Sequence, residues 1–419
     1  MTEAVTESLI PDPDPYSVSL KDIDMSVPEL YQHNLHWAYF ARLRKEDPVH
    51  YCAESAFGPY WSITKFDDIM YVERNHELFS SVPTVTIGDF ADDFETPNFI
   101  TMDPPGHDAR RIAVTPAVAP RTLVELQPVI RQRAGKILDD LPVGQTFNWV
   151  ERVSIELTTQ MLATLFDFPF EDRHLLPFWS DVMMQSEDLA GAAQIDEAER
   201  RKIMFECTEY FERLWQERSA APPKNDFISL LAHSDATKHM DRMEFLGTLF
   251  LLIVGGNDTT RNSISGGVVA LNENPDQYQK LRDNPELIPT MVSEIIRWQT
   301  PLTHMRRTAT QDTQLRDKTI RQGDKVVMWY ASGNRDEEVI DDPDEFRIDR
   351  DRARHHLAFG FGIHRCMGNR LAEMQLRTVW EEINKRFDFV ELVGEPVRVH
   401  SNFIKGFAEL PVRVHPHVD

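Results

Sequence analysis

Apolar residues recur with the period of an α-helix in six long stretches of the chain. These stretches cover residues 121–140, 150–167, 172–190, 195–218, 241–273 and 286–298. Runs typical of β-strands are short and scattered, at residues 60–63, 325–330, 387–392 and 410–414. Strands and helices do not alternate regularly, and no Gly-x-Gly-x-x-Gly sequence opens a helix. The pattern predicts a mainly α fold with small β-sheets.

The stretch 241–273 is the longest of the predicted helices and would span about 50 Å. Residues 245–254 are apolar on all sides, which predicts a buried helix. Residues 257–260, Asn-Asp-Thr-Thr, interrupt this run with a polar island directly after Gly255 and Gly256. A buried polar group is costly unless it is hydrogen-bonded or used. We therefore interpret the island as functional rather than as a solvated patch beside a glycine kink.

Composition and charge indicate how many domains the chain has and which partners are excluded. The 419 residues contain no repeat and no low-complexity linker, so we expect a single domain over 1–419, with 1–20 as a flexible N-terminal segment. With 45 basic and 68 acidic residues, the formal net charge is −23. Such an acidic surface argues against nucleic acid and against an anionic membrane as the main partner.

The cysteines and the N-terminus bear on location. Cys52, Cys207 and Cys366 form no Cys-x-x-Cys pair, so neither a disulfide framework nor a zinc site is expected. The N-terminus lacks the basic-then-apolar pattern of a signal peptide. The longest apolar run, 245–254, falls well short of the roughly 20 residues that span a bilayer. We expect a cytoplasmic protein without a membrane anchor.

The segment 359–368, Phe-Gly-Phe-Gly-Ile-His-Arg-Cys-Met-Gly, precedes a helical run at 369–385. Cys366 therefore lies where a loop enters a helix, and there the helix dipole and free N–H groups favour a thiolate. Gly360 permits a tight turn, and Gly368 permits close approach of a flat ligand. Phe359 is placed to shield the sulfur, and His364 to donate to a carboxylate. This agreement favours a ligand site over a buried structural cysteine.

The segment resembles the haem-binding loop of the cytochrome P450 family, F-G-x-G-x-H-x-C-x-G. The resemblance extends over nearly the whole chain, from about residue 24 to residue 414. It implies the cytochrome P450 fold, a triangular prism with a long central helix crossing the haem. It also implies haem b (iron protoporphyrin IX) as cofactor and Cys366 as the iron ligand.

The polar island resembles the oxygen-activation motif of the same family, [AG]-G-x-[DE]-T-[TS]. Dioxygen reduction consumes protons, which must be delivered in order. The resemblance implies Thr259 as a hydrogen-bonding group and Asp258 as the link to bulk solvent, and both are predicted to be catalytic. Gly255 and Gly256 would leave room for the haem.

Glu294 and Arg297, three residues apart on a predicted helix, resemble the Glu-x-x-Arg pair of the family. The same pattern at 197–200 is interpreted as a solvated helix face. The family adds a third member, which here is Arg350. The triad is predicted to be structural and to hold the cysteine loop.

Haem carries two propionates, which require cations or other donors. His107 and Arg111 resemble the H-x-x-x-R motif of the family at a helix start. Arg307 matches another propionate-binding arginine, with its neighbour Arg306 as an alternative. His364 is the fourth predicted propionate ligand.

The family implies a monooxygenase that uses O2 and two electrons from NAD(P)H. The expected donors are a 2Fe–2S ferredoxin and its NAD(P)H-dependent reductase, because no cluster of cysteines with ferredoxin spacing is present. A docking patch is predicted at Arg110, Arg365, Arg370 and Arg377.

The substrate pocket is expected from the 81–101 loop, the 175–200 helices and the stretch 254–259, with Val254, Leu302, Thr303, Phe403 and Ile404 as lining residues. These segments are rich in apolar residues and predict an apolar substrate. The sequence around 256–263, 301–307 and 355–362 resembles bacterial alkane and fatty-acid terminal hydroxylases. That implies ω-hydroxylation of a medium chain, with a terpenoid or steroid as the alternative substrate.

Two other functions remain as alternatives. A peroxide-driven haem-thiolate peroxygenase would not need the Asp258 and Thr259 relay. A non-catalytic haem-thiolate sensor would require an output module, for which the chain has no segment left.

Overall fold

The computed structural model describes residues 10–90, 93–184 and 195–417. The helices of this part of the chain are α1 (Pro28–Gln32), α2 (His36–Glu46), α3 (Phe66–Arg74), α4 (Gly106–Val114), α5 (Pro120–Asp139), α6 (Glu156–Leu165), α7 (Leu175–Met183), α8 (Glu197–Ser219), α9 (Phe227–His233), α10 (Arg242–Glu273), α11 (Pro275–Asp283), α12 (Ile288–Gln299), α13 (Tyr330–Gly333) and α14 (Asn369–Arg386). The strands are β1 (Val49–Cys52), β2 (Tyr60–Ile63), β3 (Phe79–Ser80), β4 (Phe147–Asn148), β5 (His304–Ala309), β6 (Thr313–Leu315), β7 (Lys318–Ile320), β8 (Lys325–Trp329), β9 (Phe387–Leu392), β10 (Val397–Arg398), β11 (Phe407–Glu409) and β12 (Pro411–Pro416).

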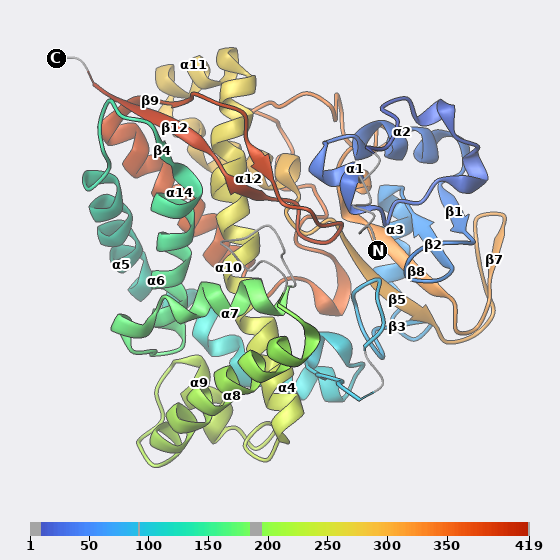
Figure 1. The fold of residues 1–419 in the computed structure, drawn as a ribbon, viewed down its shortest axis with the longest axis horizontal. Helices are drawn as coiled ribbons and strands as arrows, with labels where there is room; N and C mark the ends of the chain where they lie inside the picture. The colour runs from blue at the N-terminus through green and yellow to red at the C-terminus, as the bar shows by residue number, and fades with distance from the viewer. Residues whose placement is uncertain (1–9, 91–92, 185–194, 418–419) are drawn as a thin grey trace, which may run out of the picture.

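Helix α10 runs through the middle of the molecule, drawn yellow in Figure 1. Asp241 caps its first turn, because Oδ1 accepts hydrogen bonds from the N–H groups of Met243 and Glu244, both at 2.9 Å. The helix ends at Asn274, and Pro275 begins α11. Most of its side chains are buried against α6, α7, α12 and α14. The long buried helix predicted at 241–273 is confirmed.

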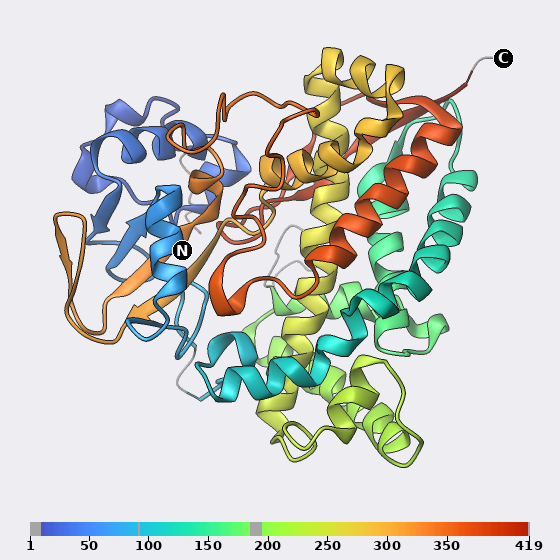
Figure 2. The same cartoon turned by 180° about the vertical axis from the view of Figure 1, so that it is seen from behind.

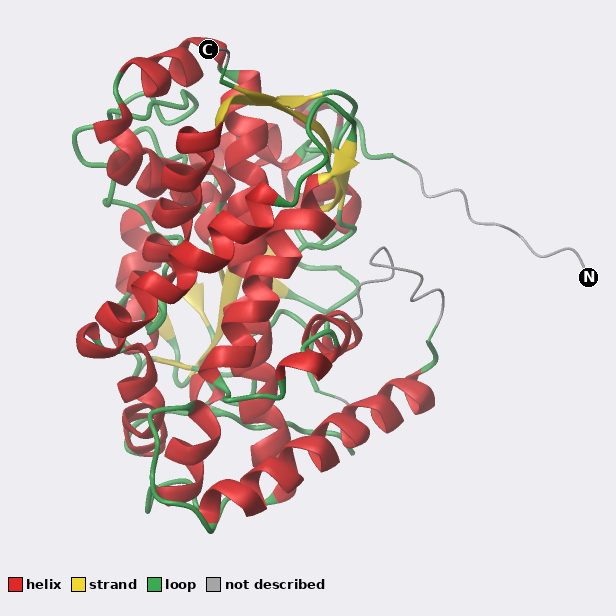
Figure 3. Ribbon diagram, turned by 90° about the vertical axis from the view of Figure 1, so that its left-hand side faces the viewer, coloured by secondary structure: helices red, strands yellow, loops and turns green. Residues whose placement is uncertain are grey.

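The sheets are small, and in Figure 3 one lies at the upper edge of the molecule and another behind the helices. Five strands pair in the order β1-β2-β8-β5-β3, and only β2 and β8 run parallel in that sheet. Three further strands pair in the order β4-β12-β9. Viewed from behind, α14 lies beside α5 (Figure 2), and the two pack together. The fold is mainly α with small sheets, as predicted.

The boundaries of several predicted elements differ from the structure. The helix predicted at 150–167 begins as a π-helix at Val150–Ile155 before α6. The helix predicted at 172–190 ends at Met183, and residues 185–190 lie outside the described part. Short elements such as α3, α9 and α11 were not predicted. Each is less than three turns long, so it carries too few apolar repeats to be recognised by periodicity.

No helix in the described residues is both long enough and apolar enough to cross a membrane.

Candidate active site

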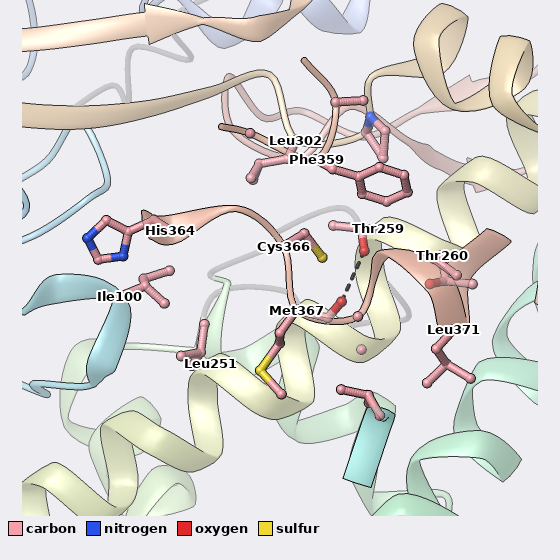
Figure 4. Close-up of a pocket in the computed structure, with 18 of the residues that line it drawn as sticks. Ile100, Leu251, Thr259, Thr260, Leu302, Phe359, His364, Cys366, Met367 and Leu371 are labelled. Atoms are coloured by element: carbon pink, nitrogen blue, oxygen red, sulfur yellow. Dashed lines mark hydrogen bonds between the residues drawn. The ribbon is translucent and has the colours of Figure 1, made fainter. Parts of the chain in front are cut away.

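A cavity of about 220 Å³ lies between α10 and the loop that precedes α14. Cys366 lines it from the loop, and Gly255 and Thr259 line it from α10 (Figure 4). Apolar side chains form much of the remaining wall, among them Leu251 of α10 and, from two other segments, Ile100 and Leu302. The structure therefore brings the cysteine loop and the polar island of the central helix to one cavity.

The cysteine loop is held in a compact turn. The N–H of Cys366 donates to the carbonyl of Phe359 at 2.8 Å. Gly360 and Gly362 adopt φ values of +64° and +66°, a left-handed region that disfavours other residues. A Cβ on Gly362 would also lie 2.3 Å from the carbonyl oxygen of Glu73, so the loop can rest on α3 only with glycine there. The glycines fix the direction in which Cys366 faces.

Burial and nearby hydrogen-bond donors and cations have opposite effects on the pKa of Cys366. The side chain is accessible from the cavity but otherwise surrounded by protein, and this burial raises the pKa of the thiol above its usual value. The amides of Gly368 and Asn369 at the start of α14 and the nearby Arg111 act in the opposite direction. The predicted stabilisation of the thiolate by the helix start is present, but alone it does not offset burial.

The α10 side of the cavity is open at Gly255, where a Cβ would meet nothing within 4 Å. Gly256 instead allows close packing on α6, because a Cβ there would lie 2.7 Å from Leu162 Cδ2. The Thr259 hydroxyl donates to the carbonyl of Gly255 at 3.0 Å, the dashed line in Figure 4. Thr259 thus places a hydroxyl at the cavity wall, on the helix that faces the cysteine loop.

Asp258 is 1% exposed and is directed toward α7. Its Oδ2 accepts a 2.7 Å hydrogen bond from Ser180, and its Oδ1 forms an ion pair with Arg261. Arg261 also donates to Asp181 at 2.9 Å. Sequence reasoning missed Ser180, Asp181 and Arg261. The position of Arg261, three residues after Asp258 on a buried helix, was the available signal.

The side chains predicted to bind propionates gather at one end of the cavity. His364, Arg111 and Arg307 line it, and the His107 ring lies 4.4 Å from the His364 ring. Nε2 of His364 is hydrogen-bonded to Ser81 at 2.8 Å, while Nδ1 of His364 and Nε2 of His107 are buried without a partner. Burial and the neighbouring cations lower the pKa of His364 to about 2. Unpaired buried nitrogens beside two arginines suit an anionic group that enters the cavity.

The comparison between Arg306 and Arg307 is decided by their contacts. Arg306 is directed away from the cavity and donates to Asp89 at 2.6 Å. Arg307 lines the cavity and donates to Glu73 at 2.8 Å, and Glu73 also accepts a hydrogen bond from Tyr330. The position matched to the propionate-binding arginine is therefore the one that faces the cavity. The Glu73 and Tyr330 contacts were not predicted, because they join segments more than 200 residues apart.

Comparison with known proteins agrees with this geometry. The cytochrome P450 family model matches residues 143–412. Linalool 8-monooxygenase from Pseudomonas putida is 36% identical over 94% of this chain and 99% of its own length. The methyl-branched lipid omega-hydroxylase of Mycobacterium tuberculosis is 32% identical over 89% of this chain and 90% of its own.

The chain belongs to the cytochrome P450 family.

Among solved structures, cytochrome P450-153 from Novosphingobium aromaticivorans is 45% identical, with a TM-score of 0.87 over 94% of this chain and 99% of its own. CYP153D17 from Sphingomonas sp. PAMC 26605 is 48% identical, with a TM-score of 0.88 over 93% and 98%. The cytochrome P450 fold, the haem b cofactor and the monooxygenase class expected from the sequence are thereby confirmed.

The residues present fit a haem. Cys366 would hold the iron, and the unpaired nitrogens of His107 and His364, with Arg111 and Arg307, would hold the propionates. A Cβ on Gly368 would lie at an ordinary contact distance, 3.9 Å, from Sγ, so packing within the protein does not itself require glycine there. The haem supplies the redox chemistry that activates dioxygen.

The predicted triad is assembled in this cytochrome P450. Arg297 donates to both carboxylate oxygens of Glu294 at 2.7 and 2.8 Å, and Arg350 donates to Glu294 at 3.1 Å. Arg297 also donates to the carbonyl of Asn334 at 2.8 Å, and Asn334 Oδ1 accepts from the N–H of Leu357 at 2.6 Å. The triad thus connects α12 to the chain that enters the cysteine loop.

The predicted pocket residues are only partly brought to the cavity. Leu302 lines it, whereas the other four, Val254, Thr303, Phe403 and Ile404, are not among its lining residues in the described chain. The hydroxyl of Thr303 instead bonds to the carbonyl of Asn402, and Ile404 pairs with Leu302 through a β-bridge. None of residues 175–184 or 195–200 lines the cavity, because α7 packs against the other side of α10.

Proposed function

We propose that this cytochrome P450 hydroxylates the terminal carbon of medium-chain alkanes or fatty acids. The observation that carries the proposal is the largely apolar wall of the cavity, whose arginine and histidine side chains, Arg111, Arg307 and His364, are those that would hold the haem propionates. An unbranched chain matches such a wall without leaving a buried polar group unpaired. The similarity to an omega-hydroxylase of methyl-branched lipids supports the same position of attack.

In this proposal, Thr259 handles protons at its Oγ1. The hydroxyl now donates to its own helix at Gly255, a bond that it can exchange for a partner in the cavity by rotating about χ1. Asp258, on the opposite face of α10, would supply protons from the side of α7.

A terpenoid or steroid is the second candidate substrate. The 36% identity to linalool 8-monooxygenase favours it, as does a relative named steroid C26-monooxygenase from Mycobacterium tuberculosis, which is 33% identical. These molecules are wider than an unbranched chain, so they would contact more of the wall at once.

A spectral titration of the haem-loaded protein separates the two candidates. Octane, dodecanoic acid, linalool and cholestenone are each added, and the shift of the haem from low to high spin is followed. The proposal expects saturable shifts with octane or dodecanoic acid and terminal alcohols as products by mass spectrometry. Tighter binding and faster turnover with linalool or cholestenone would reject the unbranched substrate.

Thr259→Ala tests the proton role. We expect NADH consumption to continue while product per NADH falls several-fold, because protons no longer arrive in order. Thr260→Ala makes the same change at the next residue, which also lines the cavity, and should keep the ratio near that of the parent. Full product yield in Thr259→Ala would refute the assignment. Little turnover with hydrogen peroxide alone is expected in all three proteins.

A 2Fe–2S ferredoxin with its NAD(P)H-dependent reductase is the proposed electron source. Arg365 and Arg370 are exposed near the cysteine loop. Arg110 forms an ion pair with Glu244, and Arg377 lies 3.5 Å from Glu381, so these two arginines contribute less free charge than predicted.

Arg370→Glu should slow reduction by ferredoxin and flatten the salt dependence of that reduction. Lys21→Glu, the same charge change at an exposed position, should have little effect.

A further inference from the structure

A second cavity, of about 70 Å³, lies beside the C-terminal part of α10. It is bordered by α10 from Gly266 to Glu273, the end of α12, the start of α2 and the chain around residues 398–407. None of its lining residues lines the catalytic cavity. The two cavities therefore occupy different stretches of the same central helix.

Three cationic side chains line this second cavity: Arg335, Arg398 and Lys405. In the described part of the chain, no carboxylate lies within ion-pair distance of Arg398 or Lys405, and Glu273 acts on both through its charge. Arg335 is 5% exposed and has one carboxylate partner, Asp344 at 3.0 Å, while its Nε has no hydrogen-bond partner. Glu273 is the acidic residue of the lining, and it is exposed. The cavity thus has an excess of positive charge.

Aromatic rings hold the cations in place. The Arg335 guanidinium lies 3.6 Å from the centre of the Trp298 ring and 4.4 Å from that of Trp37. The Lys405 ammonium lies 4.3 Å from the Trp37 ring and donates a long hydrogen bond, 3.5 Å, to the carbonyl of Trp298. Cation–π contacts favour a cation over a ring, but they leave further ammonium protons without acceptors. A negatively charged ligand would supply these acceptors.

The pKa values of these cationic side chains agree with the excess of positive charge in the second cavity. Burial and then the charges of Arg335 and Arg398 lower the pKa of Lys405 well below its usual value. Burial and the charge of Arg297 lower the pKa of Arg335 to about 9. Glu273 acts in the opposite direction on Lys405, and Asp344 on Arg335, but burial and the like charges outweigh both. A bound anion would remove this repulsion.

The backbone around Lys405 is fixed independently of any ligand. Gln299 Nε2 donates to the carbonyl of Lys405 at 2.9 Å, and a Cβ on Gly266 would collide with that glutamine. Gly406 rests on Asn262 of α10, which also accepts from the N–H of Phe407 at 3.1 Å. The charged side chains are therefore presented by a rigid frame, as a binding site requires.

We propose that this cavity is a binding site for a small oxyanion, a carboxylate or a phosphate group, held chiefly by Lys405 and Arg398. The charge-assisted hydrogen bonds would come from the ammonium and the guanidinium, and the tryptophan rings would exclude water from one side. Glu273 at the exposed edge would oppose the anion and set its affinity. The site is separate from the substrate cavity, so its occupant need not be the substrate.

Calorimetric titration of the haem-loaded protein tests the site, with inorganic phosphate in one arm and acetate in the other, at ionic strength held constant with chloride. We expect saturable binding of one anion per protein in at least one arm, and the arm that saturates identifies the group. Because the cavity is not the haem site, the Soret band should not change on binding.

Three variants and a control decide the outcome. Lys405→Met and Arg398→Gln should each weaken binding roughly tenfold, the effect of one charge-assisted hydrogen bond. Glu273→Gln should strengthen it, a gain that a damaged protein would not show. Arg370→Gln, an exposed arginine on α14, should leave it unchanged. Heat that does not saturate, or equal affinity in the parent, Lys405→Met and Arg398→Gln, would overturn the proposal.

Discussion

The cluster around Glu294 and the cluster around Arg261 are both buried and ionic, yet their stoichiometry is opposite. Glu294 is one carboxylate between two arginines, and its two oxygens accept hydrogen bonds from Arg297, Arg350 and the N–H of Arg347. Arg261 is one guanidinium between two carboxylates, Asp258 and Asp181. In the second cluster, Arg261 Nη1 has no hydrogen-bond partner in the described part of the chain. The first cluster is saturated, whereas the second keeps unused capacity.

The pKa values of the carboxyls reflect this difference between the two clusters. Burial opposes ionisation of Glu294, but hydrogen bonds and charge from Arg297 prevail and lower its pKa. Burial, together with the negative charge of Asp258, raises the pKa of Asp181 to about 6 against the opposing effect of Arg261. A saturated cluster resists protonation and suits a structural brace. A carboxyl that titrates near neutrality, as Asp181 does, suits proton transfer. The same cluster contains Asp258, which lies one residue away from Thr259 on α10.

Glu294→Gln should have the largest effect on stability. It leaves two buried arginines without a counter-charge, and we expect a loss of about 3–5 kcal/mol in the free energy of unfolding. Guanidinium titration of the haem-loaded protein measures it. Glu197→Gln is the matched control, because the same Glu-x-x-Arg pattern there is exposed and paired with Arg200 at 2.6 Å. Its cost should stay below about 1 kcal/mol. Equal losses would remove the distinction between the two pairs.

Arg261→Met should lower the free energy of unfolding by somewhat less, about 2–4 kcal/mol at pH 8. The loss is smaller because one of the two carboxyls can take up a proton. The cost should therefore shrink when unfolding is measured at pH 5. A loss that is independent of pH would show that packing, rather than charge, accounts for the role of Arg261.

Asp181→Asn should change how the free energy of unfolding depends on pH more than it changes the size of that free energy. The folded pKa of Asp181, about 6, lies above its ordinary value of 3.8, so its contribution is fully present below pH 4 and is lost as pH rises through 6. Asparagine removes this loss. Glu294 has the opposite sign, because its pKa is lowered and its contribution disappears as pH falls below its ordinary range. Unfolding curves between about pH 3 and pH 8 for the parent, Asp181→Asn and Glu294→Gln should separate the two slopes.

Ser180→Ala should have the smallest effect on stability, about 1 kcal/mol, since it removes one hydrogen bond to Asp258 Oδ2. Because Asp258 then loses a fixed partner, we expect a change in product formed per NADH that exceeds the change in stability. A matched control is Ser154→Ala, which removes a buried hydroxyl bonded to Ser265 at 2.8 Å on another part of α10. Equal effects on coupling in both variants would argue against a special role for Ser180.

Local patterns allowed much of the site to be predicted. Cys366 and its glycines form a contiguous loop, and Thr259 lies within a helix whose length and apolarity were visible in the sequence. The Glu294 and Arg297 pair is one helical turn apart, so it also follows from spacing. Long-range partners escaped prediction: Glu73 and Tyr330 at Arg307, Ser81 at His364, and Asp181 at Arg261. No spacing rule relates such positions, because helix packing alone brings them together.

The sequence by itself determined the cysteine loop, the central helix and the family, since each depends on residues that are adjacent or one turn apart. Only the tertiary structure decided which face of α10 each polar residue occupies, which of two neighbouring arginines reaches the cavity, and which apolar residues line it. It also decided where cations gather without forming an ion pair in the described chain, at Arg398 and Lys405. The physical reason is that burial and pairing of a charge depend on distant segments, which periodicity does not encode.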